Sequence, residues 1–334
     1  MIDRKEKRNL FGELIHTGAK IDREALARLL SHVLSGLTLE EFISYLTNRY
    51  EAAMHYVELT QGKKHRGHKI SLLFNPHRLT VRSRSNAPSI GESLSDPKYI
   101  SGLARATIFS YGSTNLNDML YHCLELGVNG RQLMNEFPPY RARDLCLQFG
   151  CSATSRVLDP CAGWGGRMLG VSVVSNNYHC CEPSTPTYNG LLKLRDFICA
   201  FQPAFKASVN HTPFEDHKVK PGTFDFALTS PPYYDTERYS DEATNSFNRY
   251  PSYREWCDGF FAQLVHNTMR ALKPGCAFVL SIGTRTYPMD EDLAAICKGK
   301  YELRLLNYRL GGIGAGLKGK DKKTKGEVFY EVRK

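Results

Sequence analysis

The stretch VLDPCAGWGG, residues 157–166, contains the pattern that decides the fold. An apolar run ends on a carboxylate, Asp159, and then breaks into a glycine-rich turn. Glycine lets the backbone approach a ligand without interference from a Cβ atom, and a helix that starts there offers free N–H groups. The pattern predicts a strand, a ligand-binding turn and a helix, although a glycine turn alone is also a common structural element.

A second stretch, TSPPY at residues 229–233, follows another apolar run at 224–228. Its two prolines make the backbone stiff, with a hydroxyl group before them and an aromatic ring after them. A Pro-Pro-Tyr sequence is by itself often only a turn. Its place directly after a buried strand, downstream of the glycine turn, favours a functional loop.

Apolar strand-like runs alternate with segments suited to helices from about residue 155 onward, which predicts a parallel sheet with helical crossovers. We expect seven strands, at residues 156–160, 178–182, 206–210, 224–229, 277–282, 303–308 and 328–332. The helix before the fifth strand is the clearest, because Ser252 and Glu255 form a capping box ahead of periodic apolar residues.

The two stretches together resemble the cofactor loop and catalytic loop of S-adenosylmethionine-dependent amino-methyltransferases. Asp159, Gly163 and Gly165 fit the D-P-F-x-G-x-G pattern of that family, with Cys161 where phenylalanine is usual. The resemblance covers about residues 135–334. It implies a class I methyltransferase fold, which is an α/β Rossmann-like seven-stranded sheet, with S-adenosylmethionine as cofactor and no metal.

The resemblance also implies roles for residues outside the glycine turn. Glu182, at the end of the second strand, would accept the ribose hydroxyls. Phe214 would form an apolar wall for the adenine, and Glu215 or Asp216 would be its polar contact. Pro138 lies in a Phe-Pro-Pro segment that closes over the methionine part. Structural alternatives are a solvated acidic loop near 215 and a rigid turn near 138. The implied cofactor-binding set is Pro138, Asp159, Pro160, Cys161, Gly163, Gly165, Glu182, Phe214, Glu215 and Ser230.

The chemistry of a base amine explains the second stretch. An exocyclic amine is a poor nucleophile because its lone pair is delocalised, so it needs hydrogen-bond acceptors and a stacking surface that orient it. The Ser230 hydroxyl and the Pro231 carbonyl would be the acceptors, Tyr233 the platform, and Pro232 would stiffen the loop. A base inside a duplex must be flipped out to reach such a loop.

Serine at the first position of this motif resembles the branch that acts on cytosine N4, whereas aspartate or asparagine is more typical of adenine N6. We therefore expect a DNA amino-methyltransferase that binds DNA, with cytosine N4 favoured over adenine N6. An RNA base amino-methyltransferase is the nearest alternative. Others are a non-catalytic nucleic-acid-binding protein with this fold, and transfer of a group other than methyl.

The first part of the chain matches no family pattern that we identify. Helical spacing runs through residues 23–37 and 39–59, and strand-like runs follow at 70–74 and 79–84. We expect two domains: a mainly helical, basic region at 1–130 that recognises the substrate, and a catalytic domain at 131–334. A glycine-rich and lysine-rich segment at 311–325 would attract phosphates, or would only increase solubility.

Composition limits the class of protein. The chain has 334 residues and a formal charge of +10, which suits a nucleic-acid partner without requiring one. No run of about 18 apolar residues and no signal peptide is evident, so we expect a cytoplasmic protein that does not bind membranes. The ten cysteines contain no C-x-x-C spacing and are expected to be reduced core residues rather than metal ligands.

Overall fold

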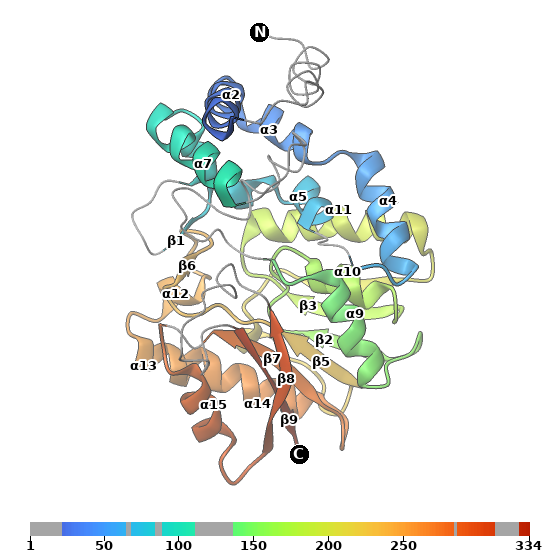
Figure 1. Cartoon of the computed structure of the whole chain (residues 1–334). Helices are drawn as coiled ribbons and strands as arrows, with labels where there is room; N and C mark the ends of the chain where they lie inside the picture. Colours follow the sequence, from blue (N-terminus) through green and yellow to red (C-terminus); the bar gives the residue numbers. More distant parts are fainter. Residues whose placement is uncertain (1–21, 65–67, 84–88, 111–135, 284–285, 311–326) are drawn as a thin grey trace. The chain divides into compact units, whose positions relative to one another are not determined.

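The computed structural model describes residues 22–64, 68–83, 89–110, 136–283, 286–310 and 327–334, and these divide into two compact units (Figure 1). One unit comprises Met1–Glu51 and Pro76–Asn135, and the other comprises Ala52–Asn75 and Glu136–Lys334. Residues 52–75, which the sequence analysis placed with the N-terminal region, thus pack within the C-terminal unit.

The C-terminal unit is built on one sheet of seven strands in the order β4-β3-β2-β5-β7-β9-β8. All seven strands predicted for this sheet are present. Neighbours from β4 to β7 pair in parallel, whereas β9 is antiparallel to both β7 and β8. This order and the reversed last strand are those of a class I methyltransferase sheet, so the predicted fold is confirmed. The bounds are Arg156–Asp159 (β2), Asn177–Cys181 (β3), Lys206–Asn210 (β4), Phe226–Thr229 (β5), Phe278–Gly283 (β7), Glu302–Leu310 (β8) and Glu327–Arg333 (β9).

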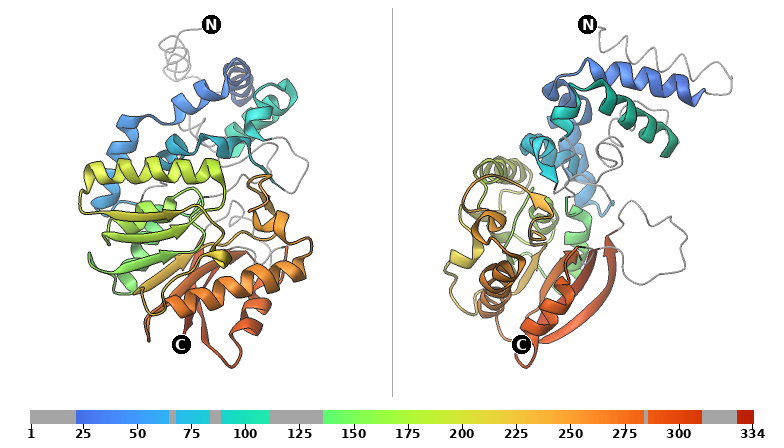
Figure 2. Two further views of the ribbon diagram at one scale, coloured as in Figure 1. Left: turned by 180° about the vertical axis from the view of Figure 1, so that it is seen from behind. Right: turned by 90° about the vertical axis from the view of Figure 1, so that its left-hand side faces the viewer.

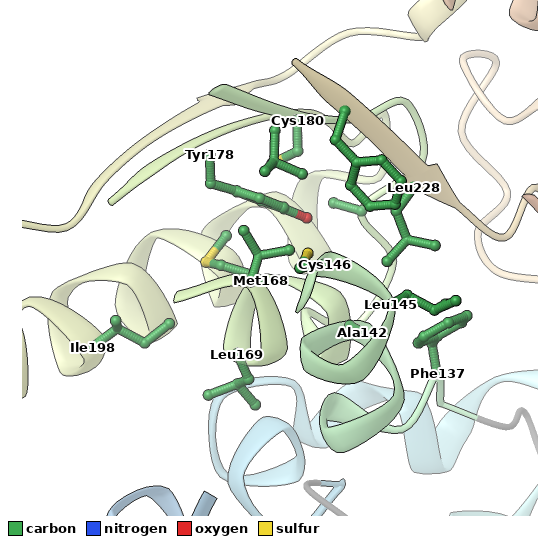
Figure 3. Packing of buried hydrophobic residues seen from close by; sticks show 14 of the residues in the cluster. Phe137, Ala142, Leu145, Cys146, Met168, Leu169, Tyr178, Cys180, Ile198 and Leu228 are labelled. Atoms are coloured by element: carbon green, nitrogen blue, oxygen red, sulfur yellow. The ribbon is translucent and has the colours of Figure 1, made fainter. Parts of the chain in front are cut away.

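Helices cover both faces of this sheet (Figure 2). Neighbouring strand residues point to opposite faces, so Val157 joins one buried cluster and Leu158 the other. The first cluster includes side chains of α9 (Pro139–Gln148), α10 (Gly166–Ser172) and α11 (Thr185–Phe201), as Figure 3 shows for part of it. The second packs against α14 (Ala262–Ala271) and α15 (Met289–Cys297). Two covered faces explain why the central strands are apolar runs rather than alternating ones.

The predicted helix before β7 begins with the expected capping box. The Ser252 hydroxyl accepts a hydrogen bond from the Glu255 N–H at 3.2 Å, and the Glu255 carboxylate accepts one from the Ser252 N–H at 3.0 Å. The helix is not uniform: α13 (Tyr253–Trp256) continues through a π-helical turn at Cys257–Phe261 before α14 begins.

The segment 52–75 braces the first face of the sheet. The Tyr56 hydroxyl, in α4 (Arg49–Thr60), lies 2.8 Å from the Ser172 hydroxyl of α10. Residues 70–74 form part of helix α5 (His68–Phe74), so the strand predicted there is wrong. Ile70, Ser71 and Leu72 are all buried, and a short apolar run of this kind does not distinguish a strand from a buried helix.

The N-terminal unit is helical, as expected. Its helix α2 (Arg23–Ser35) packs against α7 (Pro97–Ser110), and α3 (Leu39–Leu46) begins with a capping box between Thr38 and Glu41. The single helix predicted over 39–59 is instead two helices, since Thr47 is extended and the Asn48 side chain accepts from the Glu51 N–H at 2.9 Å. The other elements among the described residues of this unit are the 3₁₀ turn η1 (Pro76–Thr80), the short strand β1 (Arg82–Ser83) and α6 (Ile90–Ser93). Of the strand predicted at 79–84, residues 79 and 80 instead end this 3₁₀ turn, Arg82–Ser83 do form a strand, and residue 84 lies outside the described residues.

Close packing of α9 on α10 depends on glycine and generates a first prediction. A Cβ atom at Gly170 would lie 2.1 Å from the Pro139 carbonyl oxygen, so Gly170→Ala should lower the free energy of unfolding by about 1–3 kcal/mol. Gly36→Ala is the control, because no atom lies within 4 Å of its added Cβ. Urea unfolding measures both, and equal stability of the two variants would contradict the close approach.

Candidate active site

The two stretches that the sequence analysis singled out, residues 157–166 and 229–233, lie where two neighbouring strands of the sheet end. Strands β2 and β5 pair directly, with Val157 opposite Phe226 and Leu158 opposite Ala227. Their last residues, Asp159 and Thr229, therefore lie side by side at the carboxyl edge of the sheet. Loops at this edge form the ligand crevice in open α/β sheets.

The Asp159 carboxylate is the centre of a buried hydrogen-bond network, and the side chain is only 1% exposed. One oxygen accepts from Arg167 Nε at 2.8 Å and from the Tyr178 hydroxyl at 2.6 Å. The other accepts from the Thr229 hydroxyl at 2.8 Å and from the Cys161 N–H at 3.3 Å. Both oxygens are engaged by groups of the chain itself, so Asp159 holds the loop in shape.

Thr229 joins the two loops directly. Its hydroxyl donates to Asp159 and also accepts a hydrogen bond from the Cys161 N–H at 3.1 Å. Arg167 completes the arrangement, because it also donates to the Cys161 carbonyl. Burial lowers the pKa of Arg167, but the charge and hydrogen bond of Asp159, together with Tyr178 and Cys161, raise it by more in total, so Arg167 stays charged. The cofactor loop is thus held by side chains from three different elements.

The glycines of the loop are required by its backbone. Gly163 and Gly165 have φ angles of 54° and 91°, in the left-handed region that other residues rarely adopt. A Cβ at Gly165 would lie 2.4 Å from Leu194, and one at Gly166 would lie 2.1 Å from the Phe137 carbonyl oxygen. The loop residues before them, Pro160 and Cys161, are buried and half-buried. Burial and the Asp159 charge both raise the pKa of the Cys161 thiol.

Glu182 lies beside this loop, directly after β3. One carboxylate oxygen accepts from the Gly163 N–H at 3.0 Å, and the other accepts from the Ser184 N–H at 2.9 Å. Burial raises the pKa of Glu182 from 4.5 to about 7, although these two bonds lower it. Each carboxylate oxygen retains acceptor capacity beyond its single bond.

The adenine segment predicted after β4 is the 3₁₀ turn Phe214–Asp216. Phe214 is buried in the second core cluster, so its ring supports the turn from within the protein. The Glu215 side chain is 4% exposed, and one of its oxygens, Oε1, lies 3.0 Å from Arg249. The other oxygen, Oε2, is buried and has no hydrogen-bond partner among the described residues. Burial raises the pKa of Glu215.

Residues 137–139 also lie at the cofactor loop. The Phe137 carbonyl oxygen approaches Gly166, as its blocked Cβ position indicates, and the Phe137 ring lies 5.2 Å from the Arg167 guanidinium. Pro138, half-buried, is the residue before helix α9. The structure therefore brings the Phe-Pro-Pro segment, the glycine loop and Glu182 to one edge of the sheet.

The predicted catalytic loop, residues 230–233, continues from Thr229. Ser230, Pro232 and Tyr233 are partly exposed, and the Ser230 and Tyr233 hydroxyl oxygens are 3.4 Å apart. Pro231 is buried. The Tyr233 ring packs over Gly283 at the end of β7, where a Cβ atom would lie 2.8 Å from the ring.

Tyr234 restrains the far end of this loop. It has a φ angle of 56° and is the one described residue other than glycine with positive φ. Its hydroxyl donates to the Pro251 carbonyl at 2.9 Å, and its ring contacts four other aromatic rings. These belong to Phe247, Tyr253, Trp256 and Tyr287. An unfavourable backbone conformation of this kind persists only where its surroundings fix it.

Several residues of the site were not predicted from sequence. Thr229, Arg167, Tyr178 and Gly283 act through contacts between segments far apart in the chain. Asn75 is another: its side-chain N–H₂ group donates to the Trp164 carbonyl in the cofactor loop at 3.1 Å. Arg167 alone carried a signal, since it directly follows the glycine pattern. The lysine-rich segment 311–325 lies outside the described residues.

No family model matches the chain, and no curated protein matches it. Solved structures do resemble it. A tRNA (m1A58) methyltransferase from Aquifex aeolicus is 14% identical, over 61% of this chain and 72% of that one, with a TM-score of 0.40. A 16S rRNA N2 G1207 methyltransferase from T. thermophilus is 15% identical over 60% and 44%, with a TM-score of 0.39. A likeness at this level does not decide what this chain binds.

The structure contains no described helix that is long and apolar enough to cross a membrane. Among the described residues, no group of three His, Cys, Asp or Glu side chains is placed to hold a metal ion.

The pKa of Glu182 generates a second prediction. A carboxyl group whose pKa rises from 4.5 in the unfolded chain to about 7 in the folded one stabilises the fold at low pH, and this stabilisation is lost as pH rises from 4.5 to 7. Between pH 5 and pH 8, Glu182→Gln should therefore gain up to about 3 kcal/mol of stability relative to wild type. Urea unfolding across this range measures the difference. A difference that does not change with pH would contradict the raised pKa.

Proposed function

We propose that this chain is an S-adenosylmethionine-dependent amino-methyltransferase that acts on an exocyclic amine of a nucleic-acid base, with cytosine N4 in DNA as the first candidate. The observation that supports it best is the Thr229 hydroxyl, which bonds both to Asp159 and to the Cys161 N–H. This contact holds the glycine loop and the Ser-Pro-Pro-Tyr loop together as neighbours, as a transfer between two bound molecules requires.

The residues at the edge of the sheet fit the proposed cofactor. Glu182 offers carboxylate acceptors for ribose hydroxyls, and the glycine loop offers backbone next to it. The buried Glu215 Oε2 has no hydrogen-bond partner in the described part of the chain, and a buried acceptor of this kind is suited to a donor such as the adenine amine. When bound, S-adenosylmethionine supplies an electrophilic methyl group on a sulfonium.

The catalytic loop is suited to orient the acceptor amine. The Ser230 hydroxyl oxygen and the Pro231 carbonyl would accept the two N–H groups and turn the nitrogen lone pair out of conjugation with the ring. Tyr233, supported by Gly283, would stack on the base. Transfer forms the N–CH₃ bond, breaks the S–CH₃ bond and releases one amine proton to solvent.

Ser230 is the residue that favours cytosine N4 over adenine N6 in this proposal. An RNA base amine is the second candidate, because the loop would contact the base rather than the sugar and so suits both nucleic acids. Incubation with methyl-labelled S-adenosylmethionine and, separately, duplex DNA, single-stranded DNA and total RNA distinguishes them. Digestion to nucleosides and mass spectrometry should identify N4-methyldeoxycytidine in a DNA pool. A labelled ribonucleoside would favour the RNA candidate, and no label in any pool would favour a binding protein without this chemistry.

The division of roles generates a third prediction. Ser230 also belongs to the implied cofactor-binding set, but in this proposal its hydroxyl accepts from the amine, so Ser230→Ala removes that acceptor and leaves the carboxylates of Glu182 and Glu215 in place for the cofactor. We expect it to lower turnover at least tenfold while the Kd for S-adenosylmethionine stays within about twofold. Glu182→Ala should weaken cofactor binding about tenfold or more. Calorimetry measures the Kd for S-adenosylmethionine, and a methyl-transfer assay measures the turnover of each variant.

Ser152→Ala is the matched control, since this exposed serine precedes β2 at the opposite end of the strand. It should equal wild type in both measurements. An equal loss of cofactor affinity in Ser230→Ala and Glu182→Ala would contradict the assignment.

A further inference from the structure

We propose that Arg249 is a positioning residue that holds Glu215 so that its free oxygen receives the amino group of the cofactor adenine. This inference rests on the proposed cofactor and adds a residue that lies far from the glycine loop in sequence. It also links the adenine pocket to the segment that continues from the catalytic loop.

The contacts of Arg249 select one oxygen of Glu215. Arg249 Nη1 lies 3.0 Å from Glu215 Oε1 and 2.8 Å from Asp216 Oδ2, so one nitrogen bridges two adjacent carboxylates. The Asp216 side chain is half exposed, whereas the Glu215 side chain is almost fully buried. The ion pair with Arg249 is therefore more important for the buried Glu215 carboxylate than for the solvated Asp216 carboxylate. Oε1 is held by Arg249, while Oε2 has no hydrogen-bond partner within the ranges that the structure describes.

Burial makes this pairing necessary. An isolated carboxylate in a buried position takes up a proton or rotates toward other donors, and then it is no longer a fixed acceptor. The Arg249 guanidinium opposes this effect of burial on the pKa of Glu215 and fixes the orientation of the carboxylate. An amine that donates to Oε2 would complete the set of partners, and a ligand with a carbonyl at the same place would meet a buried negative charge.

Tyr250, the next residue, supports the same arrangement through the π-helical turn. Its hydroxyl donates to the Gly259 carbonyl at 3.0 Å and lies 3.4 Å from Glu215 Oε1. The ring occupies the space where a Cβ atom at Gly259 would lie, 2.2 Å from its Cε1 atom. Because Gly259 has no side chain, the π-helical turn leaves room for the Tyr250 ring, whose hydroxyl lies next to the Glu215–Arg249 pair.

Arg249 belongs to the segment that follows the catalytic loop and returns to the cofactor side. Earlier in this segment, Glu242 accepts from the Thr185 N–H at 3.0 Å, and the Tyr239 ring lies 5.7 Å from the Trp164 ring. The segment therefore contacts the loops that follow β2, β3 and β4. Arg249 provides a contact between this segment and the loop that follows β4.

The test compares two ligands that differ at the amine. S-adenosylhomocysteine has the amino group, and S-inosylhomocysteine has a carbonyl oxygen in its place. Calorimetry on wild type should give a Kd at least tenfold lower for the first ligand, as expected when a hydrogen bond to a buried charged acceptor is lost. In Arg249→Gln this ratio should fall to about threefold or less. Arg249→Lys, which keeps the positive charge, should retain part of the wild-type difference in Kd between the two ligands.

Arg254→Gln is the matched control, because this exposed arginine pairs with Asp258 and not with Glu215. It should keep the wild-type ratio. A role of Arg249 in folding alone would weaken both ligands equally and leave the ratio unchanged, which would overturn the inference. Equal binding of the two ligands to wild type would also overturn it while leaving the proposed cofactor intact. Failure of wild type to bind either ligand would overturn both proposals.

Discussion

The buried Asp159 carboxylate is the interaction on which the rest of the site depends. It has four donors, which come from the loop after β2, from α10, from β3 and from the end of β5. Removing one partner of a buried ion pair such as Asp159–Arg167 costs about 3–5 kcal/mol, because the other charge is left without compensation. No member of this network is therefore free to move independently. The glycine loop, and with it the positions of Glu182 and the catalytic loop, follow from this constraint.

The catalytic loop has a second restraint at its other end. Pro231 and Pro232 limit the backbone, Gly283 makes room for the Tyr233 ring, and Tyr234 is held in an unusual conformation by aromatic rings around it. A loop fixed at both ends loses little conformational entropy when a ligand binds to it. This rigidity is compatible with a proposed reaction in which the amine must be held in line with the methyl group.

The sequence was sufficient for the sheet and for the order of the motifs. Each central strand is an apolar run because both faces are buried, and Asp159, Glu182 and Ser230 each directly follow a strand or end one. Residues that act by contact across the fold were not predictable. Thr229, Asn75 and Arg249 are ordinary polar residues in the sequence, and only the neighbours that the fold provides give them a role. The helix α5 was mistaken for a strand because its buried residues are consecutive.

The most direct test of this account is the Thr229→Val variant, which removes one hydroxyl and keeps the shape of the side chain. The substitution leaves Asp159 and the Cys161 N–H each without one partner, so the loop should lose its fixed geometry. We predict a Kd for S-adenosylhomocysteine at least tenfold higher than that of wild type, together with lower turnover. Wild-type affinity and turnover in this variant would contradict the claim that Asp159 and Thr229 hold the two loops as one site.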